Sequence, residues 1–210
     1  MIGILDYGSG NLFSVVNALN KIGKEVKFIS KKSEFLKCSS IILPGVGSYK
    51  ASMKKLTDKD FLESIKKHVQ DGKLILGICL GMQMLLDSSE EDGFSKGLGL
   101  ISGKVTYLNK NTNNKKFPLP NMGWSKIIIK NKIKYKKLFV NISNYDFYFA
   151  NSLACRLNDK KQEVAYSIFG LEKFSSILIK DNIIGMQFHP EKSSASGLNL
   201  LLNIFKKNNE

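Results

Sequence analysis

The chain has 210 residues, of which 43% are hydrophobic and 24% charged, which is typical of a globular protein with a well-buried core, and we expect one domain over residues 1–210. Its formal net charge of +14 suggests phosphate binding, but 31 of the 32 basic residues are scattered lysines and only Arg156 is arginine, so we expect no nucleic-acid partner. The most apolar stretch, residues 74–86, is too short to span a bilayer, and the acidic residue Asp6 argues against a signal peptide.

The first 80 residues alternate between strand and helix patterns. Short apolar runs predict buried strands, and apolar residues spaced three and four apart predict helices between them. The expected strands cover residues 2–5, 26–29, 41–43 and 73–78, and the expected helices cover residues 12–22 and about 60–70. Strands alternating with helices form a mostly parallel sheet flanked by helices, so the chain is predicted to have an α/β fold.

The second half is richer in strand patterns joined by polar turns. The predicted strands cover residues 105–107, 125–129, 145–149, 163–169, 176–179 and 183–188. Residues 181–182 form a hairpin-like turn signal, residues 109–116 read as an exposed loop, and a final helix is expected over residues 197–206. We therefore expect extra antiparallel strands in this half.

Cys79 lies at the strongest local signal in the chain. A buried strand leads into Gly77-Ile78-Cys79-Leu80-Gly81, and an apolar helix pattern begins at once. This is the arrangement of a nucleophile elbow, with cysteine in place of serine. Glycines two residues before and after the nucleophile relieve crowding at the sharp turn, and a helix N-terminus favours the thiolate. The alternative is that Cys79 is simply a small buried apolar residue.

A nucleophilic cysteine needs a base, and the chain contains only two histidines. His68 lies at the edge of the apolar face of a predicted helix, among lysines, and we interpret it as an ordinary histidine near the surface. His189 follows a buried strand and precedes Pro190, at the kind of strand end where open α/β sheets place their sites. Glu191, two residues on, is suited to orient its imidazole.

An oxyanion hole requires backbone N–H donors. The N–H of Leu80 is one candidate, and the glycine-rich turn Pro44-Gly45-Val46-Gly47 after another strand is a second. The three cysteines are odd in number and far apart, which favours a reducing cytoplasm, and neither a metal nor another cofactor is expected from two histidines and no CxxC pair.

Two motifs together resemble those of the class I (triad) glutamine amidotransferases. They are Gly77-Ile78-Cys79-Leu80-Gly81-Met82-Gln83 and, about 110 residues later, Gln187-Phe188-His189-Pro190-Glu191-Lys192-Ser193. Residues 6–11, 44–47 and 121–124 extend the resemblance over essentially the whole chain, toward the branch of glutaminase subunits of imidazole glycerol phosphate synthases, which serve histidine biosynthesis. It implies a flavodoxin-like α/β fold.

The resemblance also implies roles for individual residues. Cys79 would attack the glutamine carboxamide and form a thioester, His189 would act as acid and base, and Glu191 would hold His189. The resemblance places Gly45, Val46, Gly47 and Leu80 at the oxyanion hole, and Gln83, Asn151 and Ser152 at bound glutamine. Ammonia would pass to a (β/α)8 cyclase subunit, forming a heterodimer, and the matching interface positions are Asn11, Met122, Trp124 and Lys192.

Some positions depart from the family pattern. Residues 151–153 read Asn-Ser-Leu where His-Ser-Tyr is usual, and Asn121 and Ser125 stand where His and Asn are commoner. These departures leave open a paralogous ammonia supplier for a cyclase-like synthase that modifies a surface sugar. A non-enzymatic α/β module with a redox-sensing cysteine is an alternative of another class.

Overall fold

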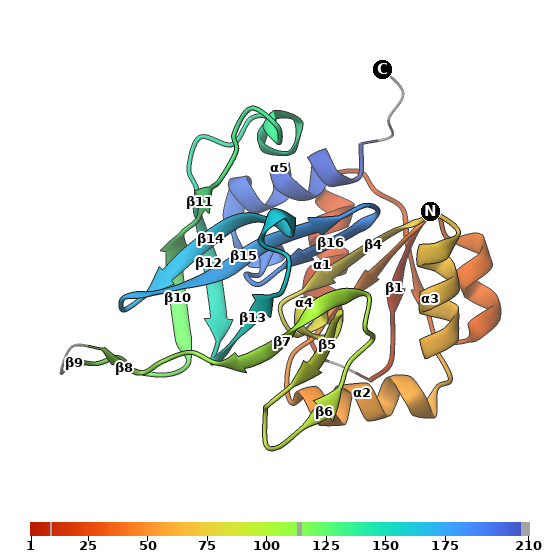
Figure 1. The fold of residues 1–210 in the computed structure, drawn as a ribbon. Coiled ribbons are helices and arrows are strands. Elements are labelled where there is room, and N and C mark those ends of the chain that lie inside the picture. Colours follow the sequence, from red (N-terminus) through yellow and green to blue (C-terminus); the bar gives the residue numbers. More distant parts are fainter. Residues whose placement is uncertain (9, 113–114, 207–210) are drawn as a thin grey trace.

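The computed structural model describes residues 1–8, 10–112 and 115–206 (Figure 1). In chain order, the first half contains β1 (Ile2–Leu5), α1 (Leu12–Lys21), β2 (Val26–Ile29), η1 (Lys32–Lys37), β3 (Ser40–Leu43), α2 (Tyr49–Asp58), α3 (Leu62–Gln70), β4 (Leu74–Ile78), α4 (Leu80–Met84), β5 (Leu86–Ser89), β6 (Ser95–Lys96) and β7 (Ile101–Tyr107). The second half contains β8 (Asn111–Thr112), β9 (Lys115–Lys116), β10 (Asn121–Lys126), β11 (Ile128–Ile129), η2 (Lys136–Phe139), β12 (Asp146–Asn151), β13 (Leu153–Leu157), η3 (Lys160–Gln162), β14 (Glu163–Phe169), β15 (Glu172–Lys180), β16 (Ile183–Met186), η4 (Pro190–Lys192) and α5 (Ser194–Ile204).

An eight-stranded sheet organises the fold, in the order β11-β14-β15-β16-β4-β3-β1-β2. The five strands from β16 to β2 pair in parallel. The remaining three strands add to them in antiparallel fashion, through the hairpin at residues 181–182. A four-stranded sheet (β13-β7-β5-β6) and the pair β10–β12 complete the second half. The predicted α/β class, a mostly parallel sheet with added antiparallel strands, is therefore confirmed.

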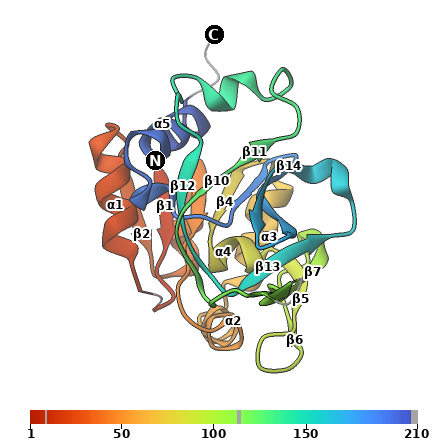
Figure 2. The same ribbon diagram turned by 90° about the vertical axis from the view of Figure 1, so that its left-hand side faces the viewer.

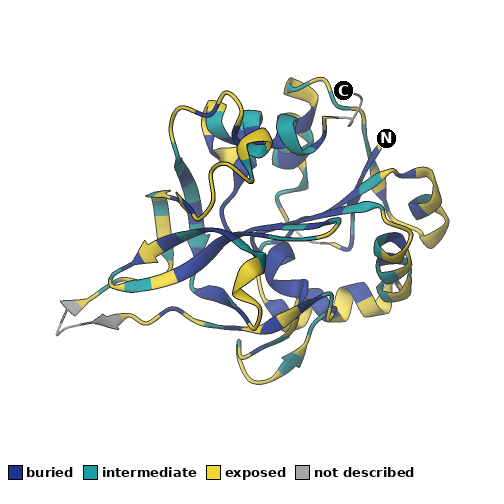
Figure 3. Cartoon of the chain, turned by 45° about the horizontal axis from the view of Figure 1, so that its top comes forward, coloured by how far each residue is buried: buried dark blue, intermediate teal, exposed yellow. Residues whose placement is uncertain are grey.

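Two apolar clusters cover the two faces of the sheet. One unites sheet residues with α1, α5 and β12, and the other unites sheet residues with α2, α3 and the four-stranded sheet. Figure 2 shows α1 and α5 together on one side of the strands, and Figure 3 shows that the central strands are buried while the outer sides of the helices are exposed. Because both faces are covered, the parallel strands read as continuous apolar runs.

Some local predictions were incomplete. Helix α2 was not predicted, and the expected strand over residues 125–129 is divided between β10 and β11, which join different sheets. The predicted loop at 109–116 contains the short paired strands β8 and β9, while residues 113–114 lie outside the described structure. Within the described ranges no helix is long and apolar enough to cross a membrane.

Candidate active site

Adjacent parallel strands bring the predicted site residues to one edge of the sheet. Strand β3 leads into residues 44–47, β4 leads into Cys79, and β16 leads into His189. Ile78 and Met186, the last residues of β4 and β16, are partners in the register, and the Cys79 N–H donates to the Met186 carbonyl oxygen at 2.7 Å. The carboxyl ends of parallel strands meet at the same edge, which is where open α/β sheets bind ligands.

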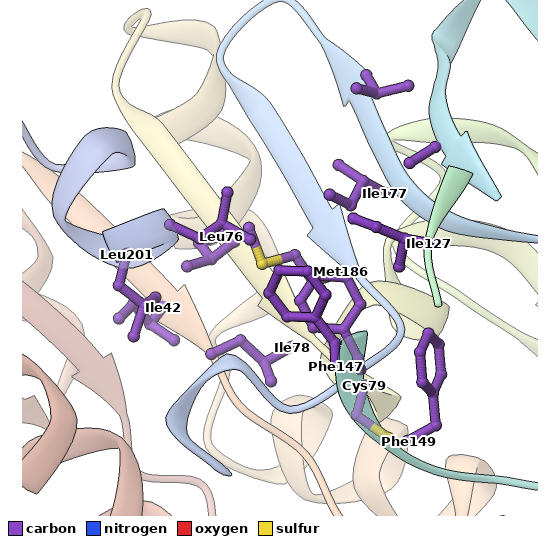
Figure 4. Packing of buried hydrophobic residues seen from close by; sticks show 14 of the residues in the cluster. Ile42, Leu76, Ile78, Cys79, Ile127, Phe147, Phe149, Ile177, Met186 and Leu201 are labelled. Carbon is purple, nitrogen blue, oxygen red and sulfur yellow. The ribbon is translucent and has the colours of Figure 1, made fainter. Parts of the chain in front are cut away.

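Cys79 adopts the strained turn that the elbow motif predicts. Its φ is 54° and its ψ is −109°, which is unusual for a residue other than glycine. A Cβ at Gly81 would lie 1.8 Å from the Leu43 carbonyl oxygen, and one at Gly77 would lie 2.7 Å from the Gly81 carbonyl oxygen. Glycine is therefore required on both sides of the turn. Figure 4 shows Cys79 at the edge of the apolar cluster, near Phe147 and Phe149.

His189 and Glu191 form a buried ion pair beside Cys79. His189 Nδ1 lies 2.8 Å from Glu191 Oε1, and the two side chains are 3% and 0% exposed. Burial by itself would lower the pKa of His189, but its interactions with Cys79 and Glu191 outweigh burial and raise that pKa to about 10. The imidazole is therefore held as a cation at neutral pH, with Cys79 as its second partner.

Glu191 has a second partner that we did not foresee. Asn11 Nδ2 donates to the same Oε1 atom at 2.8 Å, whereas Glu191 Oε2 is buried without a hydrogen-bond partner. Asn11, predicted to face a partner protein, is half-buried and precedes α1 in the left-handed conformation, with φ 67°. Its side chain does not cap α1, although asparagine commonly does so at this position.

His68 does not belong to this site, but our prediction that it lies near the surface was wrong. Its side chain is 3% exposed, and its Nε2 lies 3.2 Å from the Leu74 carbonyl oxygen. Burial lowers its pKa and keeps the ring neutral. His68 and Ile65 lie on the buried face of α3, at helical spacing from the buried Phe61, which immediately precedes the helix.

A cavity of about 300 Å³ opens at this edge of the sheet. Its lining includes all three predicted glutamine-binding residues, Gln83, Asn151 and Ser152, and five residues of the predicted triad and oxyanion hole, Val46, Gly47, Cys79, Leu80 and His189. The predicted interface residue Lys192 also lines it, together with Glu91, Pro120, Ala150 and Leu153. Gly45 instead packs against the elbow, where an added Cβ would lie 2.7 Å from Leu80 Cβ. The structure thus brings the two predicted oxyanion segments together.

Glu91 is a charged residue of the cavity that sequence reasoning missed. It follows β5 in a polar turn with no motif around it, and its carboxylate accepts a hydrogen bond from the N–H of Tyr49, the first residue of α2. Anions are favoured at helix N-termini, so this contact holds a negative charge at the cavity. Helix α2 directly follows the 44–47 turn, and therefore Glu91 also anchors the end of that turn.

The polar side chains at the departure positions satisfy one another. Asn151 Nδ2 donates to the Leu153 carbonyl oxygen at 2.9 Å, and Asn121 Nδ2 donates to Asn151 Oδ1 at 3.4 Å. Asn151 is buried, while Ser152 is half-buried. The two asparagines, both at positions where histidine is expected, therefore fix the cavity wall beside Leu153, which stands where tyrosine is expected.

An apolar surface adjoins the cavity. Met122 and Trp124 are 65% and 54% exposed on one face of β10, directly opposite Ala150 and Tyr148 of β12. The Trp124 and Tyr148 rings are in edge contact, and Lys192 Nζ lies 6.0 Å from the centre of the Tyr148 ring. Since Ala150 and Lys192 also line the cavity, the surface continues to its mouth.

Comparison with known proteins decides the family. The model of the family "Glutamine amidotransferase class-I" matches residues 3–208. The chain belongs to this family. It is therefore a glutamine amidotransferase, and the non-enzymatic alternative loses its support. Among the described residues, no cluster of ligating side chains fit for a metal ion is found.

Curated relatives of this glutamine amidotransferase carry a common name. The chain is 39% identical to "Imidazole glycerol phosphate synthase subunit HisH" of Sulfurimonas denitrificans, over 100% of this chain and 99% of the relative. It is 41% identical to the protein of the same name from Caldanaerobacter subterraneus, over 97% and 96%. It is 42% identical to "Imidazole glycerol phosphate synthase subunit HisH 1" of Campylobacter jejuni, over 98% and 100%.

Solved structures share the fold at lower identity. A crystal structure of a glutamine amidotransferase has a TM-score of 0.71 at 17% identity, covering 96% of this chain and 98% of that one. The structure of PurLQS from Thermotoga maritima has a TM-score of 0.72 at 21% identity, covering 97% and 96%. At these identities the likeness concerns the fold alone.

Proposed function

We propose that this glutamine amidotransferase is the glutaminase subunit of an imidazole glycerol phosphate synthase, and that it supplies ammonia to a cyclase subunit. The names of its relatives and their full-length matches support this assignment. The observation that carries the chemistry is the buried His189–Glu191 pair beside Cys79 at the cavity.

The first half of the reaction begins with the Cys79 thiolate. Its electron pair forms a bond to the carboxamide carbon of glutamine, and the carbonyl oxygen becomes an oxyanion. Backbone N–H groups of Leu80 and of the 45–47 turn are the donors available to that oxyanion. When the C–N bond breaks, the departing nitrogen takes the proton that His189 holds, so ammonia and a glutamyl thioester result.

The second half returns the enzyme to its starting state. Neutral His189 takes a proton from water, and the resulting hydroxide adds to the thioester carbon. The C–S bond then breaks, its electron pair returns to Cys79, and glutamate leaves. Glu191 keeps His189 in position throughout and stabilises its charged form, as the acid of a triad does.

The cavity wall offers groups for the rest of the substrate. The Glu91 carboxylate suits the α-ammonium of glutamine, and backbone groups of Asn151 and Ser152 are available to the carboxamide and the main chain. The Asn151 side chain is committed to Leu153 and Asn121, so its contribution is the shape of the wall. These assignments explain how the pocket functions without the usual histidine and tyrosine.

The partner is proposed to cover the face formed by Met122, Trp124, Tyr148 and Lys192, together with the neighbouring Asn11. Exposed aromatic, methionine and cationic groups of this kind are enriched at protein interfaces. Because this face continues to the cavity mouth, a partner seated there would receive ammonia directly. We also propose a cytoplasmic location, consistent with three free cysteines.

The test is made on the complex with its cyclase. Cys79→Ala should abolish glutamine-dependent synthesis and leave ammonia-dependent synthesis unchanged, because only the ammonia source is lost. Loss of both activities in an assembled complex would contradict the assignment. Identifying the co-purified barrel subunit distinguishes the two partners: a histidine-pathway cyclase supports the proposal, whereas a sugar-locus homologue would favour the paralogous function.

A further inference from the structure

Two buried side-chain amides, those of Gln83 and Gln187, lead from the cavity wall to Cys79. The proposed reaction steps do not use Gln187. Gln187 follows β16, two residues before His189, and its side chain is fully buried. Its Nε2 lies 3.7 Å from Cys79 Sγ. Its Oε1 lies 3.1 Å from Nε2 of Gln83, which is also buried.

The orientation of both amides follows from a backbone carbonyl. Gln83 Nε2 lies 3.3 Å from the Leu153 carbonyl oxygen, and a carbonyl oxygen can only accept. Gln83 must therefore direct its NH2 group toward Leu153, and the second N–H of that group faces Gln187 Oε1. Because the oxygen of Gln187 is fixed at this end, its NH2 group must face Cys79.

An N–H donor beside a cysteine sulfur stabilises the thiolate more than the neutral thiol. A neutral thiol is a weak acceptor, whereas hydrogen bonds to an ionised group are roughly twice as strong as neutral ones. A fully buried amide donor also needs a partner, since leaving it unsatisfied is costly. The sulfur atom is the partner that the structure provides for this end of Gln187.

We propose that Gln187 is a further catalytic residue, which donates an N–H to Cys79 Sγ and stabilises the thiolate, and that Gln83 is a positioning residue that orients it. The role in turnover rests on the proposed glutamine hydrolysis. When the thioester forms, the sulfur electron pair enters the S–C bond and the hydrogen bond weakens. When that bond breaks, the pair returns to sulfur and the hydrogen bond stabilises the leaving thiolate; Gln187 transfers no proton.

This proposal changes the expected role of Gln83. Sequence resemblance assigns it to bound glutamine, and the side chain does line the cavity. However, both N–H groups of its amide are directed at Leu153 and Gln187. Any contact between Gln83 and substrate is therefore left to its Oε1 atom, which can only accept.

The first test measures alkylation of Cys79 by iodoacetamide in the free full-length chain, with the labelled peptide identified by mass spectrometry. Gln187→Met keeps the volume and removes the donor, so labelling at about pH 7 should slow about tenfold, the equivalent of one hydrogen bond to a charged group. Equal rates for variant and wild type would overturn the proposal.

The other titratable groups around Cys79 are unchanged in this comparison. They are His189, which is paired with Glu191, and Cys155 on β13, whose thiol has a pKa raised by burial and stays neutral. Glu91 and Lys192, which line the same cavity, are also unchanged. Gln162→Met, a matched change in η3 outside the cavity, is the control and should label at the wild-type rate. A general loss of structure would instead expose the buried Cys38 and Cys155 to labelling.

A second variant tests the orientation. Gln83→Leu leaves Gln187 in place but removes the donor that fixes its direction, so Cys79 labelling should also slow, by less than in Gln187→Met. In the assembled complex both variants should lower kcat for glutamine hydrolysis and leave ammonia-dependent synthesis intact. If the variants label more slowly but the wild type has no glutaminase activity, the proposed function is refuted, while the contact between Gln187 and the thiolate stands. If both variants label at the wild-type rate, the contact between Gln187 and the thiolate is refuted, while the proposed glutamine hydrolysis stands.

Discussion

Replacing Glu191 by Gln isolates the charge of the buried pair. The substitution keeps the size of the side chain, and the amide oxygen can still accept from His189 Nδ1. It removes the negative charge that lies 2.8 Å from that nitrogen. Its amide NH2 group would take the place of Oε2, which has no partner in its buried environment. The variant therefore loses a charge-assisted bond and gains an unsatisfied donor.

The size of the effect follows from the contact. A hydrogen bond to a charged group contributes about 1.5–3 kcal/mol, which corresponds to a decrease of about 10- to 150-fold in kcat for glutamine hydrolysis. The upper part of this range is favoured because both side chains are almost inaccessible to solvent. KM for glutamine should change little, since Glu191 does not line the cavity.

The same pair makes stability depend on pH. The pKa of His189 in the folded chain is about 10, raised from 6.5. The stabilisation by its proton is therefore fully present below the unfolded value and is lost as the pH rises through about 10. Glu191→Gln lowers the folded-state pKa of His189, so the difference in unfolding free energy between wild type and variant should be largest below pH 6.5 and shrink as the pH approaches 10.

The assay combines glutaminase rates of the complex with urea unfolding of the free chain over this pH range. Glu63→Gln is the matched control, because it removes an exposed ion pair with Lys66 on α3. Such pairs contribute about 0–1 kcal/mol, and the control should keep its kcat. A Glu191→Gln variant with wild-type kcat, or with a stability deficit that does not vary with pH, would show that the charge of Glu191 does not support His189 as described.

Three further changes test the surroundings of the site. Gly81→Ala should prevent formation of the elbow and cost well over about 3 kcal/mol in urea unfolding, because the new methyl group would overlap the Leu43 carbonyl oxygen; wild-type stability would be inconsistent with the turn described. Asn11→Gly keeps a residue suited to positive φ but removes the hydrogen bond to Glu191, so kcat for glutamine hydrolysis should decrease about tenfold with KM unchanged. An effect on the affinity for the partner alone, measured by titration, would assign Asn11 to the interface only. Ser193→Ala removes the hydroxyl that accepts from the Tyr148 N–H and donates to the His189 carbonyl oxygen. The free energy of unfolding should decrease by about 1–3 kcal/mol. An unchanged free energy of unfolding would indicate that water replaces the hydroxyl.

The sequence predicted the parts of the fold that local patterns determine. Continuous apolar runs identified the central strands, and the glycines around Cys79 identified the elbow because a sharp turn tolerates no Cβ there. Helix α2 was missed, although Tyr49, Met53 and Leu56 have helical spacing and are buried, because lysines and other polar residues fill the positions between them. His68 was misjudged for the same reason: charged neighbours obscured a spacing that places it inward.

Contacts between distant segments could not be predicted from local patterns. Asn11 and Glu191 are 180 residues apart, and nothing around Asn11 indicates that its amide bonds a carboxylate instead of capping its helix. Glu91 lies in a turn without a motif, and it reaches the cavity only because β5 continues from the short helix after Cys79. The row formed by Gln83 and Gln187 likewise exists only once β4 and β16 are neighbours.

Covalent trapping tests whether Cys79 is the nucleophile toward glutamine. The complex with its cyclase is treated with a diazoketone analogue of glutamine, and the modified residues are mapped by mass spectrometry. We expect stoichiometric labelling of Cys79, protection by added glutamine, and no labelling of the buried Cys38 and Cys155. An unmodified Cys79 in an assembled complex, or equal labelling of all three cysteines, would contradict the nucleophilic role of Cys79.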